Sequence, residues 1–545
     1  MTSNASRRRR ATGVLAVFVL SLALAACSSG SSDADADSET PIVVGVSALG
    51  TKWGTPDSGQ DGTLFGNLHA GLVRKAYVAA DGDYVGGQDV YSFEPYLAES
   101  YDVSDDGLVY TFHLRDDVES SSGNALTADD VVYSYERKFA SPAGTTIAVT
   151  APVLTSADQV QKVDDATISI TIPSASFGTQ LLALLSDYTG GIYDSTLLKE
   201  HETADDPYAI EWSDTEPNYG FGPYVVDDYR EGQYIDYVKN PGFPADLGTG
   251  AERFRYTLIA DAGTQLSALR AGDIDIAMGL LPADVSALES EDGITVPLVE
   301  TPNEWLLIPT VTTSAPFDNV AVRQALAYAI PYDELIDSVY YGRASKVEYG
   351  PISTQTPGYS SDGLEGYNYD IDRAKELLAE AGYSDGVSFT LTIDSSRADL
   401  EAAAILIQTR AAEAGFDISI EKVSNAALWE GITAKSFQAF MMRDYAITQT
   451  QSYVMRLFTQ PGSFANLGNW EDDEYYAAEE AAEAVPDQLS AEAGAEWAKA
   501  EAILLEQFPI NYALQIQPTV AYASDISGYV WRTDNYLDLT QITRE

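Results

Sequence analysis

Alternating hydrophobic and polar residues predict β-strands in both halves of the chain. Every second residue is apolar in 108–114, 166–172 and 387–393, as in strands that bury one face. The shorter run Ile42–Val46 is more continuously apolar and also predicts a strand. Strands are therefore expected near the start, in the first third and in the last third of the chain.

Helical periodicity predicts a crossover connection in the second half. A helix is expected over 400–414, between the strand at 387–393 and a further strand at 416–423. This strand–helix–strand order predicts a parallel strand pair joined by the helix. A second unit of this kind is expected over 251–277, where Asp261 can cap a helix that Gly272 ends.

Three further helices complete the predicted α/β class. One begins after Thr127 with an acidic residue at its third position, one is amphipathic over 372–381, and the Ala/Glu-rich range 474–507 is expected to be helical. Helices of this kind can cover a sheet in each half of the chain. The pattern shows no internal repeat.

The N-terminal 26 residues have the order of a secretory signal. The basic block Arg7–Arg10 precedes the apolar run Ala11–Ala26, which is shorter than the roughly 20 residues that span a bilayer. A short transmembrane anchor is the alternative. No later segment is long and apolar enough for a membrane helix.

Cys27 is the only cysteine of the chain, and it follows Leu24-Ala25-Ala26. This sequence resembles the bacterial lipobox, whose cysteine becomes the lipidated first residue of the mature protein. Residues 28–39 are small, polar and acidic, as in a flexible tether. Lipidation of Cys27 and a location on the outer face of the bacterial cytoplasmic membrane are therefore expected, with the lipid as the only membrane attachment.

Composition and charge exclude several other classes. The 545 residues include 31 Lys and Arg against 83 Asp and Glu, a formal net charge of −52 that argues against nucleic-acid binding. Without residues 1–26, which hold four arginines and no acid, the net charge is −56. One cysteine and three scattered histidines leave no expected metal site or cofactor. We interpret most of the negative charge as a solvated surface on exposed helices, with preference for cationic ligands as the alternative.

Seven separated motifs occur in a fixed order along residues 41–540. They are Leu97-Ala98-Glu99-Ser100 with Tyr110–Val118; Leu126–Ser134; Gly222-Pro223-Tyr224 with Lys239-Asn240-Pro241; Ala271-Gly272-Asp273-Ile274-Asp275; Val322–Leu326; Tyr340-Tyr341-Gly342; and Ala374–Tyr383. Together they resemble family 5 of the bacterial extracellular solute-binding proteins, the receptors of the peptide/nickel/opine group of ABC importers. The chain departs from the family after the Leu114-Arg115 strand, where it reads Glu119-Ser120-Ser121-Ser122-Gly123.

The resemblance implies an α/β fold of the two-lobed, type II periplasmic-binding-protein (Venus flytrap) class with an extra inserted domain. A ligand would be enclosed between lobes joined by crossing strands. The expected division is a signal peptide (1–26), a tether (27–40), lobe I (41–84, 211–306 and 511–545), a subdomain inserted in lobe I (85–210) and lobe II (307–510).

The resemblance also suggests an amine-binding aspartate. Peptide receptors of the family supply it within W-x-A-D-Y, and the nearest match, Met441–Tyr445, keeps Asp444 and Tyr445 but lacks the tryptophan. An ungapped alignment places Ile447-Thr448 there instead. The alternative role for Asp444 is a solvated acid paired with Arg443 or another base. Ring stacking on a ligand makes Tyr445, Trp53, Trp305 and Trp429 further candidates, although such rings also pack in cores.

The predicted function is that of a monomeric receptor that captures a peptide by lobe closure and delivers it to ABC permease subunits in the membrane. A non-peptide solute, such as an oligosaccharide, opine or metal chelate, is the alternative ligand. A secreted lipoprotein hydrolase and a surface receptor or adhesin are the other classes considered. No motif nominates a catalytic residue, so an enzyme is not expected.

Overall fold

The computed structural model describes residues 40–50, 53, 66–141, 151–461 and 465–545. Pro41–Glu545 form one unit by their mutual contacts. The predicted signal peptide, the tether as far as residue 39 and Cys27 lie outside the described residues.

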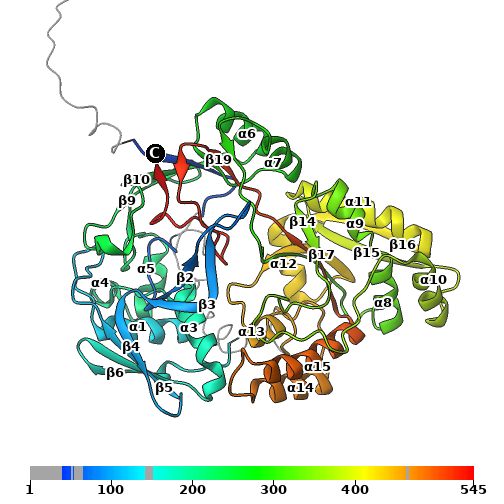
Figure 1. The fold of residues 1–545 in the computed structure, drawn as a ribbon, viewed down its shortest axis with the longest axis horizontal. Coiled ribbons are helices and arrows are strands. Elements are labelled where there is room, and N and C mark those ends of the chain that lie inside the picture. Colours follow the sequence, from blue (N-terminus) through cyan, green and yellow to red (C-terminus); the bar gives the residue numbers. More distant parts are fainter. Residues whose placement is uncertain (1–39, 51–52, 54–65, 142–150, 462–464) are drawn as a thin grey trace, which may run out of the picture. The chain divides into compact units, whose positions relative to one another are not determined.

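The first and largest sheet contains strands from the start, middle and end of the chain (Figure 1). Its order is β12 (Ile294–Thr295), β19 (Ala521–Ala523), β11 (Ile276–Ala277), β1 (Ile42–Val46), β10 (Arg253–Leu258), β9 (Tyr234–Lys239) and β8 (Tyr224–Arg230). β1 pairs in parallel with both β10 and β11, and α6 (Ala262–Ala271) connects those two strands. Asp261 caps α6 by accepting the Thr264 N–H at 2.7 Å, and Gly272 ends it at φ +73°, as predicted. α7 (Pro282–Leu288) follows β11.

The second sheet has six strands and contains both antiparallel and parallel pairs. Its order is β14 (Ala344–Lys346), β18 (Ile510–Ile516), β13 (Glu304–Pro309), β17 (Ala439–Tyr445), β15 (Val387–Asp394) and β16 (Phe416–Val423). β15 and β16 are parallel and α11 (Ala398–Ala411) connects them, which confirms the predicted crossover. The other helices of this region are α8 (Val320–Tyr328), α9 (Tyr332–Ser338), α10 (Ile371–Glu380) and α12 (Asn425–Ala434).

A separate antiparallel sheet lies between residues 98 and 171. Its order is β4 (Ala98–Val103), β5 (Val109–Leu114), β7 (Thr167–Thr171) and β6 (Val160–Asp164). The helices of this region are α1 (Ala128–Phe139), α3 (Gly178–Ser186), α4 (Ser195–His201) and α5 (Ile210–Ser213). Two strand pairs stand apart from these sheets: β2 (Val73–Val78) with β3 (Gly87–Pro95), and β20 (Ile526–Ser527) with β21 (Thr543–Arg544).

The range predicted as one helix over 474–507 contains two. α14 (Asp473–Glu483) ends before Pro486, and α15 (Ala491–Gln507) begins after Ser490, whose hydroxyl oxygen accepts the Ala493 N–H at 3.2 Å. Proline cannot continue a helix, and serine is a strong N-cap, so both residues favour the break. The short α13 (Gln451–Arg456) precedes them.

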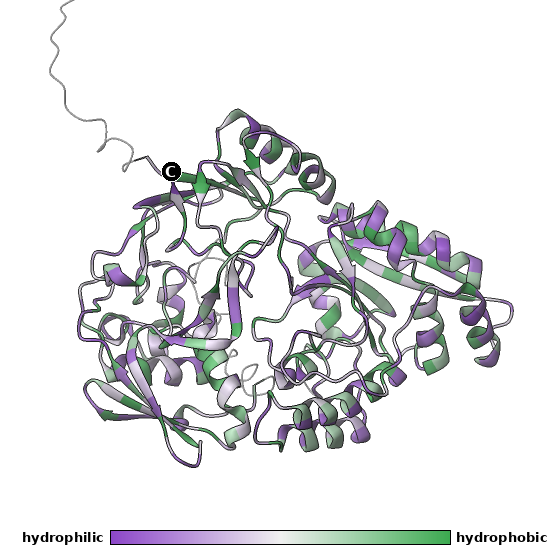
Figure 2. Cartoon of the chain, viewed as in Figure 1, coloured by the Kyte–Doolittle hydropathy of each residue, from purple (hydrophilic) through white to green (hydrophobic). Residues whose placement is uncertain are grey.

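Hydrophobic and hydrophilic residues alternate along the helices (Figure 2). One core cluster joins Phe112 of the four-stranded sheet with Trp305 and Tyr512 of the six-stranded sheet. A second lies within the six-stranded sheet and its helices, and a third under the seven-stranded sheet. In the described part of the chain, no helix combines the length and apolar character needed to cross a membrane.

Candidate functional site

Asp444 lies near the carboxyl end of β17, directly opposite Trp305 of β13. Paired residues of an antiparallel ladder point to the same face of the sheet, so the two side chains are neighbours. The Asp444 Oδ1 accepts the backbone N–H of Tyr445 at 2.8 Å. Among the described residues, no base forms an ion pair with this carboxylate.

Burial raises the pKa of Asp444 to about 7, and the negative charge of Glu304 acts in the same direction. Arg397 and the Tyr445 hydrogen bond oppose the rise. Arg443, the expected alternative partner, is engaged elsewhere: it forms ion pairs with Glu304 and, at 3.1 Å, with Asp399. Asp444 is therefore a half-buried carboxylate with a raised pKa, and it would gain from a cationic hydrogen-bond donor.

Arg397 is a further candidate site residue, which the sequence did not nominate. β15 and β17 are parallel neighbours, so their carboxyl ends lie at one edge of the sheet. Arg397 follows the end of β15 at the start of α11 and is half-buried. Among the described residues, it has no ion pair with a carboxylate, although its charge lowers the pKa of Asp444. Arg397 could have been found in the sequence as a basic residue shortly after the predicted strand at 387–393, since α/β proteins place ligand-binding groups at such strand ends.

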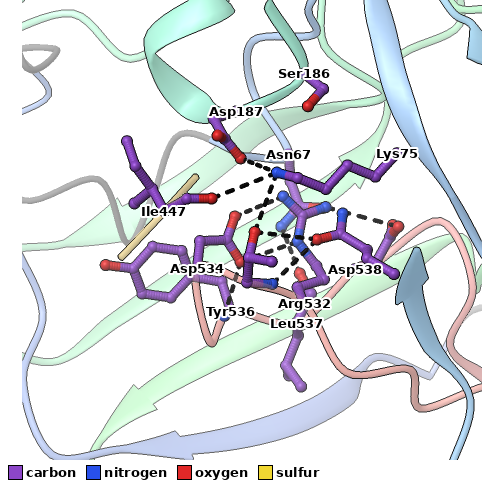
Figure 3. Close-up of polar contacts among 12 residues, drawn as sticks. Asn67, Lys75, Ser186, Asp187, Ile447, Arg532, Asp534, Tyr536, Leu537 and Asp538 are labelled. Carbon is purple, nitrogen blue, oxygen red and sulfur yellow. Dashed lines mark hydrogen bonds and ion pairs between the residues drawn. The ribbon is translucent and has the colours of Figure 1, made fainter. Parts of the chain in front are cut away.

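A buried ion pair lies beside the segment that follows β17 (Figure 3). Lys75 of β2 pairs with Asp187, which follows α3, and both side chains are almost fully buried. The Thr448 hydroxyl donates to the other Asp187 oxygen at 2.9 Å, and Lys75 Nζ donates to Thr533 Oγ1 at 3.1 Å. Burial raises the pKa of Asp187, while Lys75 acts in the opposite direction. The pair therefore connects the Thr448 segment to β2, to α3 and to the C-terminal segment.

Further hydrogen bonds hold the same segments together. The Asn303 side-chain amide donates to the carbonyl oxygens of Ala446 at 2.9 Å and Thr533 at 2.6 Å. The Tyr91 hydroxyl of β3 donates to the Gln449 carbonyl at 3.1 Å. Residues 446–449, directly after Asp444, are thus in contact with chain segments outside the six-stranded sheet.

Tyr445 extends this contact. The Tyr445 hydroxyl donates to the hydroxyl of Tyr536 in the C-terminal segment at 3.4 Å. In the same segment, Arg532 forms ion pairs with Asp534 and Asp538. Tyr536 and Asp534 lie beside the Lys75–Asp187 pair in Figure 3. The region offers a carboxylate, a guanidinium and two phenol groups to a small polar ligand.

The three tryptophan candidates occupy different surroundings. Trp305 is 1% exposed and meets Tyr512 edge-on with ring centroids 5.4 Å apart, so it lies beside Asp444 as part of the core. Trp53 packs edge-on against Tyr229 at 5.0 Å and lines a cavity of about 470 Å³ next to the β8–β9 hairpin. Trp429 lies on α12 and is 36% exposed.

Asp444, Tyr445 and Trp305 are therefore brought together by the β13–β17 pair. Among the described residues, no hydrogen bond or ring contact joins Trp53 or Trp429 to Asp444. Trp53 instead packs against Tyr229 of the β8–β9 hairpin, and Trp429 lies on α12.

Sequence comparison relates this chain to known proteins. The profile described as bacterial extracellular solute-binding proteins, family 5 (middle part) matches residues 92–466. The chain is 34% identical over 307 residues to heme-binding protein A of Haemophilus influenzae, and this alignment covers 54% of each of the two chains. It is 31% identical over 319 residues to the dipeptide-binding protein of Escherichia coli, and this alignment covers 54% of this chain and 56% of the relative. The matched part thus spans about half the length of these relatives.

The fold is also shared with solved structures. An ABC transporter-associated periplasmic binding protein of Helicobacter pylori, solved in complex with the peptide STSA, superposes with a TM-score of 0.76 at 24% identity and covers 93% of this chain and 98% of that one. A dipeptide-binding protein of Pseudoalteromonas, in complex with Met-Leu, gives a TM-score of 0.77 at 19% identity, covering 93% of this chain and all of that one. This likeness confirms the predicted two-lobed α/β fold of the periplasmic-binding-protein class.

Proposed function

The chain belongs to family 5 of the bacterial extracellular solute-binding proteins, and on that premise we propose that it is the extracytoplasmic receptor of an ABC importer for peptides. The observation that carries this proposal is the half-buried Asp444 carboxylate, which has no ion-pair partner among the described residues. Arg397, whose charge lowers the pKa of Asp444, has none in that part of the chain either. Closure of the lobes around the peptide would favour the ligand-bound form through its additional contacts.

The two charged groups suit the two ends of a short peptide. The Asp444 carboxylate would accept hydrogen bonds from the α-ammonium group, and the Arg397 guanidinium would bind the α-carboxylate. An ammonium group would also hold Asp444 in its ionised form, because an opposite charge lowers the pKa that burial raises. Tyr445 and Tyr536 would border the bound peptide.

A non-peptide solute is the second candidate ligand. It is supported by relatives named as a heme-binding protein and, in Escherichia coli, as a nickel-binding periplasmic protein, the latter 28% identical over 53% of each chain. A ligand without an ammonium group would leave Asp444 without a role in binding, which separates the two candidates.

The proposal includes anchoring by a lipid on Cys27, after removal of residues 1–26, and delivery of the ligand to membrane permease subunits by a monomeric receptor. It also retains the predicted lobes. The expected lobe boundaries after residues 306 and 510 fall within β13 and β18, which pair with each other in the six-stranded sheet. Strands at such boundaries are suited to connect two lobes that move as units.

Native mass spectrometry of the purified protein, followed by thermal unfolding with a panel of di- and tripeptides, heme and nickel–histidine, tests the proposal. Peptide binding should raise the melting temperature by mass action. A rise with heme or the nickel chelate and none with any peptide would contradict the peptide assignment.

A further inference from the structure

The main chain changes partners where β17 ends. Tyr445, the last residue of β17, still pairs with Glu304 of β13. In residues 446–449, by contrast, three carbonyl oxygens and one hydroxyl group are hydrogen-bonded to side chains from outside the strands of the six-stranded sheet. Buried main-chain groups need such partners once strand pairing stops. The segment 446–449 is thus held in place by side chains of other segments.

These four hydrogen bonds join the two predicted lobes. Residues 446–449 fall within 307–510, the range expected for lobe II, whereas their partners fall within the ranges expected for lobe I and its inserted subdomain. In chain order, the bonded pairs are Ala446 with Asn303 (2.9 Å), Ile447 with Lys75 (3.5 Å), Thr448 with Asp187 (2.9 Å) and Gln449 with Tyr91 (3.1 Å). Four consecutive residues of one lobe therefore contact four separate positions of the other.

The buried Lys75–Asp187 pair is completed from lobe II (Figure 3). Lys75 bonds to one carboxylate oxygen of Asp187, and the Thr448 hydroxyl donates to the other oxygen. The side chains of Lys75 and Asp187 are 0% and 3% exposed, so their remaining hydrogen-bonding positions must be filled from within the protein. Thr448, which is itself fully buried, fills one of these positions only while the two lobes are in contact.

Tyr91 of β3 contacts lobe II at two points. A tyrosine hydroxyl has one proton. Because the Tyr91 hydroxyl donates to the Gln449 carbonyl, it accepts its second hydrogen bond, at 2.8 Å, from the Thr356 hydroxyl. Thr356 is 3% exposed and lies in the segment between β14 and α10. One hydroxyl group of the inserted subdomain thus connects two segments of lobe II.

We infer that Thr356 and residues 446–449 form a latch with the side chains of lobe I, and that Tyr91 and Thr448 are positioning residues for ligand binding. This inference rests on the proposed function and on the predicted lobes. Every group in the latch belongs to the protein, so its bonds hold the lobes together before a ligand binds as well as afterwards. A bond made only in the closed form raises the population of that form and slows ligand release, while a ligand still enters the open form at the same rate.

Small-angle scattering of the ligand-free, purified protein tests the latch without any ligand. The double variant Tyr91→Phe/Thr448→Val should have a larger radius of gyration than the wild-type protein, because more molecules are open. Tyr91→Phe alone, which removes one hydroxyl group at a half-buried position, should show a smaller increase and keeps the test valid if the double variant does not fold.

The matched control is Tyr224→Phe/Thr310→Val, which removes the same two hydroxyl groups inside single lobes. Tyr224 donates to the carbonyl oxygens of Ala251 and Leu539, all in the ranges expected for lobe I. Thr310 donates to the Pro509 carbonyl within the range expected for lobe II. The control variant loses hydrogen bonds of the same kind, but its radius of gyration should equal that of the wild-type protein.

Stopped-flow measurements with Ala-Ala test the effect on binding. Dissociation should be about fivefold faster in Tyr91→Phe and about tenfold faster in Thr448→Val, whose hydroxyl is bonded to a charged group, with little change in the association rate. A radius of gyration that is unchanged in the latch variants, or dissociation that is accelerated equally in the control, would overturn the latch alone. Failure of the wild-type protein to bind Ala-Ala or any other peptide, with the radius still larger in the latch variants, would overturn the proposed function and leave the latch as a contact between the lobes.

Discussion

Asp444 lies directly opposite Trp305 across the antiparallel pair β13–β17, while the adjacent Arg443 is bound to Glu304 and Asp399. Successive residues of a strand point to opposite faces of the sheet. This register separates the carboxylate of Asp444 from the nearest guanidinium in the sequence. Asp444 has no ion-pair partner among the described residues, whereas Arg443 holds β13, β17 and α11 together.

The raised pKa of Asp444 predicts a pH-dependent stability. Its pKa is about 7 in the folded protein and near 4 in the unfolded chain, so the folded state binds the extra proton between these values. The free energy of unfolding should therefore fall as the pH rises from about 4 to 7 and then level off. Asp444→Asn should remove this loss, which is on the order of 4 kcal/mol at pH 8.

Urea unfolding of the ligand-free protein between pH 4 and 8 measures this difference. Asp417→Asn, at an exposed position of β16, is the control and should follow the wild-type curve. If the free energies of unfolding of the wild-type protein and Asp444→Asn differed by the same amount at every pH, the pKa of Asp444 would not be raised in the folded protein.

Arg397→Gln should weaken binding of dipeptides with a free α-carboxylate by about tenfold or more, because a charge-assisted hydrogen bond is lost. The same substitution should have little effect on a dipeptide amide, which lacks that charge. Calorimetric titration of both ligands measures the difference. If the substitution weakened binding of the dipeptide and of its amide equally, Arg397 would not bind the α-carboxylate.

Lys75→Met should destabilise the protein by about 3–5 kcal/mol, because it leaves the buried Asp187 without its counter-charge. The double variant Lys75→Met/Asp187→Asn should regain much of this loss in chemical unfolding. Lys162→Met, at an exposed ion pair with Asp129, is the control and should change little. If the double variant were no more stable than Lys75→Met, the loss of stability would not come from an uncompensated charge on Asp187.

Cys27→Ser should release the protein from the membrane fraction of the bacterial host into a soluble extracytoplasmic fraction. The expectation follows from the lipobox-like Leu24–Cys27 and from the short apolar run before it. Fractionation and immunoblotting measure the distribution. A variant that stays membrane-bound after carbonate washing would favour a transmembrane anchor instead.

Local signals in the sequence predicted the elements well. The strict alternation at 387–393, the capping Asp261 and the helix end at Gly272 all correspond to observed boundaries. The expected continuous helix over 474–507 was wrong in the middle, where Pro486 separates two helices. Helix and strand boundaries of this kind depend only on residues that are neighbours in the sequence, so they can be predicted from it.

The site could be predicted only in part. Asp444 and Tyr445 followed from a family resemblance, but the placement of Trp305 beside Asp444 depends on pairing between strands about 140 residues apart. The bond between Asp187 and Thr448 joins still more distant segments. Arg397 was missed because its proximity to Asp444 arises from the parallel order of β15 and β17, which no local pattern specifies.

In the proposed receptor, Asp444 binds the α-ammonium group of a peptide. The most direct test of this contact is calorimetric titration of the wild-type protein and Asp444→Asn with a dipeptide and with the same dipeptide acetylated at its N-terminus. Acetylation should weaken binding to the wild-type protein by about tenfold or more and should hardly change binding to Asp444→Asn. An equal loss on acetylation in both proteins would contradict the claim.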